Sequence, residues 1–162
     1  MVISQKWVLI IGGLCVRQTR TQILEVAKAF DDAIETRDID QILPFFAKDC
    51  VIEILGVTLT GWTGVRRWLT WMFSHLDAVR FEPVVIMVEG DIFFEEFIVT
   101  GTLKDGRQIT SKQAEVLIYE DLKVKHLRIY FDRLDFADAV ASGWLNRSVI
   151  RRLKHISTKG LV

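Results

Sequence analysis

The sequence has few of the residues that mark specialised classes of protein. Its two cysteines, Cys15 and Cys50, are too few for a disulfide-rich scaffold and show no CxxC or Cys/His spacing, so we expect no metal site and no cofactor. Two prolines and ten glycines argue against long disorder. The 21 Lys and Arg residues balance the 21 Asp and Glu residues, so we expect no nucleic-acid partner.

A hydrophobic run long enough to span a bilayer is also missing. The longest run, residues 7–16, is too short to cross one, so we expect no membrane partner. The run lacks a small-x-small cleavage site, which favours an N-terminal extension over residues 1–18 and a cytoplasmic protein. A signal peptide over residues 1–20 is the alternative.

The chain has 162 residues, half of them hydrophobic, which is enough for one domain with a core. Capping signals at Thr19 and Asp38 predict two early helices, and a third follows from about Gly64. An Asp-Gly pair at 105–106 predicts a hairpin. The predicted strands are residues 50–55, 79–88, 92–103, 108–119 and 123–131, and the predicted C-terminal helices begin near residues 132 and 144.

Early helices followed by a meander of long strands predict an α+β fold. We expect a curved, mostly antiparallel sheet wrapped like a cone around about three N-terminal helices, with a ligand cavity inside. The predicted domain covers residues 19–142, and residues 143–162 form a basic helical tail.

Three segments carry a resemblance to a known family: residues 29–54, the glycine-rich turn into the helix 64–76, and residues 126–140. They resemble the NTF2-like superfamily, whose SnoaL-like branch includes polyketide cyclases and limonene-type epoxide hydrolases. The resemblance spans about residues 20–142. It implies the cone fold and leaves the reaction open, because this fold hosts enzymes and non-enzymes.

The catalytic residues of these relatives do not carry over. An ungapped match places the Asp-Arg-Asp set of the epoxide hydrolases on Ile98, Glu96 and Ile129, and its helping Tyr and Asn on Ile52 and Ile54. The ketosteroid isomerase pattern fares no better, since its first-helix Tyr matches Phe30 and its general-base Asp matches Ile54. Both named reactions are therefore disfavoured.

Glu96 and Glu115 are the leading catalytic candidates. If Ile98 and Ile129 face the cavity, strand alternation puts Glu96 on the same face, and Gln113 and Glu115 on that side of the partner strand. A carboxylate among isoleucines is poorly solvated, so its pKa rises, which suits an acid or base near neutral pH. The alternative is that this polar face points to water.

Asp132 is the next candidate, because SnoaL-type cyclases are described as using one Asp as acid/base. It also stands where its carboxylate can cap the helix that follows, which we favour. His75, at the end of the third predicted helix, is either a polar group at the cavity mouth or a surface histidine.

The predicted ligand-binding set is apolar and aromatic, with an ordinary hydrophobic core as the alternative. It comprises Phe30, Ile54, Trp68, Trp71, His75, Ile98, Gln113 and Ile129. We also expect a homodimer, because one sheet face is too apolar for water. That face is Phe97, Val99, Ala114, Val116 and Ile118.

Two hypotheses from different classes follow. The first is a cofactor-independent cyclase or isomerase that moves a proton on an apolar polycyclic or terpenoid substrate, with Glu96, Asp132 or Glu115 as acid/base. The second is a non-catalytic module of the same fold that binds a small apolar molecule or a protein. Epoxide hydrolysis comes third.

Overall fold

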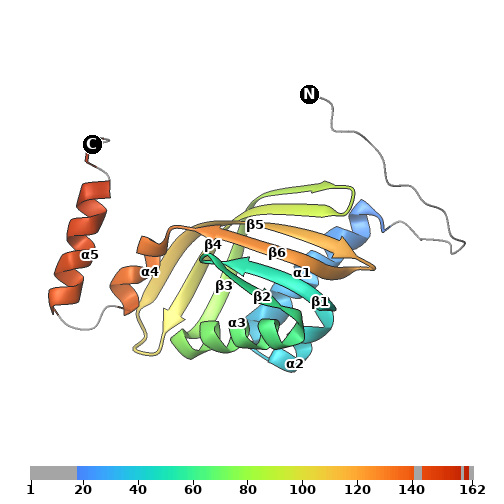
Figure 1. Cartoon of the computed structure of the whole chain (residues 1–162), viewed down its shortest axis with the longest axis horizontal. Coiled ribbons are helices and arrows are strands. Elements are labelled where there is room, and N and C mark those ends of the chain that lie inside the picture. The colour runs from blue at the N-terminus through green and yellow to red at the C-terminus, as the bar shows by residue number, and fades with distance from the viewer. Residues whose placement is uncertain (1–17, 141–143, 158, 161–162) are drawn as a thin grey trace, which may run out of the picture.

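The computed structural model describes residues 18–140, 144–157 and 159–160. Their helices and strands confirm the predicted α+β class. Figure 1 shows the three early helices gathered beneath one face of a curved sheet. The elements are α1 (Arg20–Thr36), α2 (Ile39–Ile42), the 3-10 turn η1 (Leu43–Phe45), β1 (Phe46–Ile54), β2 (Val57–Thr60), α3 (Gly61–His75), β3 (Leu76–Glu89), β4 (Ile92–Leu103), β5 (Gln108–Glu120), β6 (Lys123–Phe131), α4 (Arg133–Val140) and α5 (Trp144–Ser157).

The six strands form one sheet in the order β2-β1-β6-β5-β4-β3. All neighbours run antiparallel except β1 and β6, which are parallel. The sequence did not predict β2, a four-residue strand in the glycine-flanked segment after β1. Pro83 lies in edge strand β3 at a shift in register, a position where a sheet tolerates proline.

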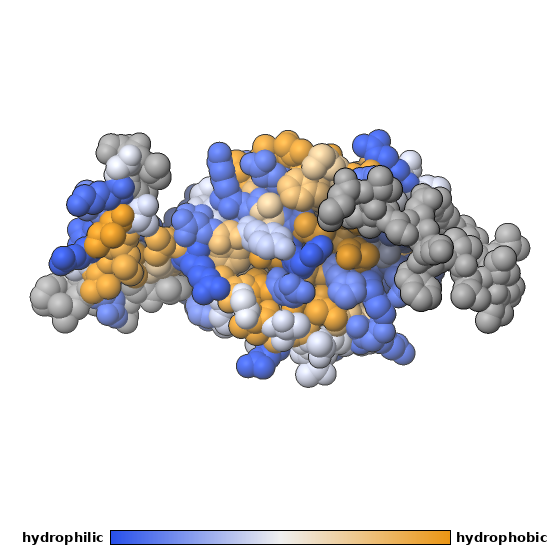
Figure 2. Space-filling model, turned by 45° about the horizontal axis from the view of Figure 1, so that its top comes forward, coloured by the Kyte–Doolittle hydropathy of each residue, from blue (hydrophilic) through white to orange (hydrophobic). Residues whose placement is uncertain are grey.

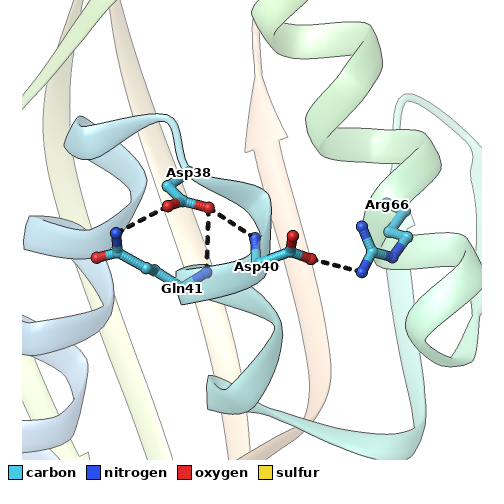
Figure 3. A network of polar contacts seen from close by, with 4 residues as sticks. All are labelled: Asp38, Asp40, Gln41 and Arg66. Atoms are coloured by element: carbon cyan, nitrogen blue, oxygen red, sulfur yellow. Dashed lines mark hydrogen bonds and ion pairs between the residues drawn. The ribbon is translucent and has the colours of Figure 1, made fainter.

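The early helices begin where the sequence has its caps. The Thr19 hydroxyl accepts a hydrogen bond from the Gln22 backbone N–H at 3.3 Å, and the Gln22 side chain accepts from the Thr19 N–H at 2.8 Å. The Asp38 carboxylate caps α2 by accepting hydrogen bonds from the backbone N–H groups of Asp40 and Gln41. An Arg66–Asp40 ion pair of 2.6 Å joins α3 to that helix (Figure 3). These contacts determine where α1 and α2 begin and join α2 to α3.

The core lies between α1, α3 and the face of the sheet that they cover. The buried stripe of α1 is Ile23, Ala27, Phe30 and Ile34, with Trp68 and Leu69 entering from α3. Fully buried sheet residues include Ile52, Leu117 and Leu127. Burial of this apolar surface is the main stabilisation of the fold.

The structure shows that part of the predicted dimer surface does not lie on the outer face of the sheet. Phe97 and Val99 are buried on the inner face, so they do not belong to it. Ala114, Val116 and Ile118 do lie on the outer face, half-buried. Figure 2, with the top of the molecule turned forward, shows apolar and polar residues interspersed there. The homodimer stays a prediction.

The two ends of the chain leave other predictions open. The apolar run at 7–16 lies outside the described residues. In the described part, no helix is long and apolar enough to cross a membrane. α5 lies beyond α4 (Figure 1) and carries an exposed apolar stripe of Val149, Leu153 and Ile156. The predicted domain boundaries at residues 19 and 142 also stay predictions.

Candidate active site

A cavity of about 370 Å³ lies between the helices and the inner face of the sheet. This volume is at the lower end of the range of about 300–1,000 Å³ typical of small-molecule sites. Its walls are mainly aromatic and aliphatic and come from α1, α3, α4 and the sheet. Of the residues predicted from the sequence, the lining includes Phe30, Ile54, Trp68, Trp71, His75, Gln113, Glu115 and Ile129.

The cavity has a closed end and an open end. At the closed end, Glu115 on β5 and its ladder partner Ile129 on β6 line the cavity. The next residues on the same face of these strands, Leu117 and Leu127, are fully buried. At the other end lie Trp71, 47% exposed, with His75 and the exposed Arg133. A ligand would therefore enter past α3 and α4 and reach toward β5.

Glu96 and Ile98 are on the wrong face for the roles predicted for them. The buried positions of β4 are its odd-numbered residues, Phe93, Glu95 and Phe97 among them, so the even-numbered residues point to the outer face. Glu96 pairs with Ala114 across the ladder, and neither Glu96 nor Ile98 lines the cavity. The prediction that Glu96 and Ile98 face the cavity is therefore wrong.

Three carboxylates meet at the closed end of the cavity: Asp31 from α1, Glu95 from β4 and Glu115 from β5. One oxygen of each lies within 4.8 Å of the others. Glu95 is 2% exposed and Glu115 6% exposed. Asp31 and Glu115 line the cavity, and Glu95 adjoins them without lining it. We call these residues the acid cluster; sequence reasoning found only Glu115.

Burial raises the pKa of every member of the acid cluster. The pKa of Asp31 rises from 3.8 to about 8, through burial and then through the charge of Glu95 and of its helix neighbours Asp32 and Glu35. Burial raises the pKa of Glu95 from 4.5 to about 7. The pKa of Glu115 is raised well above 4.5, first by burial and then by Asp31 and Glu95. The cluster therefore holds protons near neutral pH.

Two polar atoms at this end are buried without a hydrogen-bond partner: Glu95 Oε1 and the hydroxyl of Tyr119. Tyr119 lies on β5, four residues after Glu115 and on the same face of the strand. The pKa of Tyr119 is raised first by burial and then by the charges of Glu115, Asp31 and Glu95. Unpartnered buried groups are rare in folded proteins and often mark functional sites.

The donor set of the acid cluster limits what it can hold. It is the one group of three potential metal-ligating side chains found among the described residues, and all its donors are carboxylate oxygens. Zinc sites usually add His or Cys, which this cluster lacks. The expectation of no metal and no cofactor stays a prediction.

Asp132 lies outside the cavity lining. Its Oδ1 accepts a hydrogen bond from the Leu134 backbone N–H at 2.8 Å, at the start of α4, and its side chain is exposed. The structure therefore shows the capping contact that the sequence favoured. His75 does line the cavity, but its Nδ1 lies 2.8 Å from the Trp71 carbonyl oxygen, within its own helix.

Comparisons with known proteins agree with this architecture. The sequence profile of a protein family described as a SnoaL-like domain matches residues 26–127. No curated protein sequence matches the chain.

Several solved structures share the fold at low sequence identity. An NTF2-like protein of Burkholderia pseudomallei K96243 is 19% identical with a TM-score of 0.68, covering 75% of this chain and 98% of that chain. An epoxide hydrolase/cyclase-like enzyme, SalBIII, is 15% identical with a TM-score of 0.64, covering 71% and 94%. An LEH-like epoxide hydrolase of M. tuberculosis is 18% identical with a TM-score of 0.62, covering 85% and 96%.

Proposed function

The chain belongs to the SnoaL-like domain family, and on that premise we propose that it is a small-molecule enzyme of the cyclase or isomerase type. The proposed reaction is acid/base proton transfer on an apolar cyclic substrate, without a cofactor. The observation that carries the proposal is the acid cluster of Asp31, Glu95 and Glu115 at the closed end of an apolar cavity.

The acid cluster offers a donor and an acceptor of protons at the same pH. Near pH 7 the Glu95 carboxyl is about half ionised, because its pKa is about 7. The raised pKa of Glu115 keeps its proton in place. A substrate carbonyl against Glu115 accepts that proton on oxygen while the ionised carboxylate of the Asp31–Glu95 pair takes a proton from the adjacent carbon. The product is an enol, and one proton enters the cluster for each that leaves.

The walls of the cavity support this chemistry. Aromatic and aliphatic side chains exclude water, which strengthens electrostatic interactions between the acids and a bound carbonyl. Trp68 and Phe30 line the cavity and provide flat apolar surfaces. Most of the relatives' catalytic positions match apolar residues in this chain, so the proposed proton transfer depends on its own carboxylates, those of the acid cluster.

Deuterium exchange tests the proposal directly. The full chain is incubated with 1-tetralone, an apolar cyclic ketone, in deuterated buffer near pH 7, and deuterium at the carbon next to the carbonyl is followed by NMR. We expect the wild type to accelerate exchange and Glu115→Gln to lower the rate at least about a hundredfold, the size of typical acid/base contributions.

The adjacent carboxylates on β4 provide a matched control. Glu95→Gln should lose exchange, whereas Glu96→Gln, one residue away on the outer face, should keep it. If wild type and Glu115→Gln exchange equally slowly although the ketone binds, the alternative of a non-catalytic binding module is favoured. That alternative is also supported by the apolar residues at the relatives' catalytic positions, Phe30, Ile52 and Ile54.

A further inference from the structure

The closed end of the cavity holds a surplus of hydrogen-bond acceptors. Among the described residues, no hydrogen bond or ion pair reaches the carboxylates of Asp31, Glu95 or Glu115. The nearest cation on the same helix, Lys28, is exposed and forms an ion pair of 2.7 Å with Asp32. Three acidic groups within 4.8 Å of each other thus have no basic side chain to neutralise them.

The Tyr119 hydroxyl is a second, separate polar group that is buried without a partner. The side chain is 2% exposed, and its hydroxyl has no hydrogen-bond partner. It comes from the buried core beyond the cavity and lies within electrostatic reach of all three carboxylates. A phenolic oxygen can accept a hydrogen bond as well as donate one, so it adds to the acceptors around the cluster.

We propose that the closed end binds the protonated amine of a ligand whose apolar body fills the rest of the cavity. This inference rests on the proposed function and names the class of substrate for that same site. An alkylammonium carries up to three N–H donors and one positive charge, which complement the carboxylates of Asp31 and Glu115 that line the cavity. The faces of nearby aromatic rings add a favourable contact for a cation.

The charge at the open end fixes the orientation of such a ligand. Arg133 lines the cavity at the start of α4, at the opposite end from Glu115. Its guanidinium repels an ammonium group and attracts the acceptor end of a ligand. The amine is therefore directed inward, toward the end where the reacting carbonyl meets Glu115, and any further acceptor group of the ligand points outward.

Amine binding competes with the protons of the acid cluster. The ammonium favours an ionised carboxylate, so a proton leaves as the ligand binds, and affinity rises with pH over the range in which Asp31 and Glu95 titrate. The other charged groups near Asp31 are Asp32, Glu35 and Lys28 on α1. Glu115 keeps its proton and remains the acid of the proposed reaction.

A pair of probes that differ in one group tests the inference. The full chain is titrated with 2-aminotetralin and with 2-tetralol, its neutral counterpart, by calorimetry at about pH 6 and pH 8. We expect the amine to bind about tenfold more tightly than the alcohol at pH 8, with the preference shrinking at pH 6. The amine should release protons on binding, seen as a heat that depends on the buffer.

Variants test whether the acid cluster causes the preference for the amine over the alcohol. Glu95→Gln and Tyr119→Phe should each reduce the affinity for the amine and leave that for the alcohol unchanged, while Glu96→Gln changes neither. Equal affinity for the two probes in the wild type overturns the inference, as does an amine preference that survives Glu95→Gln. So does stabilisation by MgCl₂ with none by the amine.

The probe titration and the deuterium-exchange experiment can fail independently of each other, because 1-tetralone has no nitrogen. Deuterium exchange without an amine preference removes the inference and leaves proton transfer standing. An amine preference without exchange supports the binding site and removes the catalytic proposal.

Discussion

Glu95 lies directly opposite Glu115 in the antiparallel ladder of β4 and β5. Like charges at opposing positions of a ladder destabilise a sheet, and these two are also buried against Asp31. The arrangement is compatible with a folded protein because the raised pKa values keep much of the cluster protonated. The sheet thus tolerates at the closed end of the cavity a group of acids that would not be stable in their ionised form.

Stability should fall as the pH rises from about 5 to about 8. A group whose folded pKa is raised stabilises the fold fully below its unfolded pKa and loses that contribution as pH rises through the folded pKa. For Glu95 these values are 4.5 and about 7, and for Asp31 they are 3.8 and about 8. Urea unfolding at the two pH values measures the loss.

Glu95→Gln should flatten this dependence. Its ionisation costs the folded protein up to about 3 kcal/mol at pH 8, since each pKa unit corresponds to about 1.4 kcal/mol. We expect the variant to be more stable than wild type at pH 8 and to differ little at pH 5. Glu96→Gln, on the outer face, should follow the wild-type profile. A wild type equally stable at both pH values contradicts the prediction.

The strand that carries Glu95 shows why sequence reasoning chose the wrong glutamate. From Phe93, β4 reads Phe-Phe-Glu-Glu-Phe-Ile-Val, so the odd-numbered and the even-numbered residues both form an apolar face. Strand alternation alone therefore cannot tell which of the two sets faces the cavity.

The register of the hairpin between β4 and β5 decides which glutamate shares the face of Glu115. This register pairs Thr102 with Gln108, so odd residues face odd residues across the ladder and Glu95 shares the face of Glu115. The Asp-Gly signal alone would not have corrected the assignment, because a two-residue turn at 105–106 pairs Lys104 with Arg107 and therefore Glu96 with Glu115. In the structure the Leu103 N–H donates to the Arg107 carbonyl oxygen instead, which shifts the register by one residue.

Asp31 was missed for a different reason. It lies four residues after Ala27 and three before Ile34, on the buried stripe of α1, where helix periodicity places a core-facing residue. An acid in such a stripe is a signal of function, and helix periodicity could have distinguished Asp31 from its acidic neighbours Asp32 and Glu35. The element order, the helix caps and the hairpin were predictable because local signals determine them. The acid cluster depends on contacts between α1, β4 and β5.

Asp132 should be a structural residue. Because its carboxylate accepts a hydrogen bond from Leu134 N–H at the start of α4, Asp132→Ala should destabilise the protein by about 1 kcal/mol, the typical cost of losing a helix cap. Asp132→Asn should retain the cap and the stability. Both variants should exchange deuterium into 1-tetralone at the wild-type rate. Loss of exchange in a well-folded Asp132→Asn would instead restore its catalytic candidacy.

Ser111 should hold α4 over the open end of the cavity. The buried Ser111 hydroxyl donates a hydrogen bond of 2.7 Å to Asp135 Oδ2, and Phe136 and Ala137 of the same helix line the cavity. Ser111→Ala should therefore increase amide hydrogen exchange in α4 and speed the dissociation of bound ligand by severalfold, since a hydrogen bond to a charged group contributes about 1.5–3 kcal/mol. The β5 amides beyond Glu115 serve as the internal control. Unchanged exchange in α4 would show that other contacts hold the helix.

The acids of the cluster should act as one titrating unit, not as separate sites. At about pH 8, Glu95→Gln and Asp31→Asn should each stabilise the protein, because each removes a buried charge and relieves the remaining carboxylates. The double variant should gain less than the sum of the two, by about 0.5–3 kcal/mol, since the repulsion between them can be removed only once. The same cycle at about pH 5, where both carboxyls are protonated, should be additive. Urea unfolding of the four proteins at both pH values gives the coupling, and strict additivity at pH 8 would mean that the two carboxyls titrate independently.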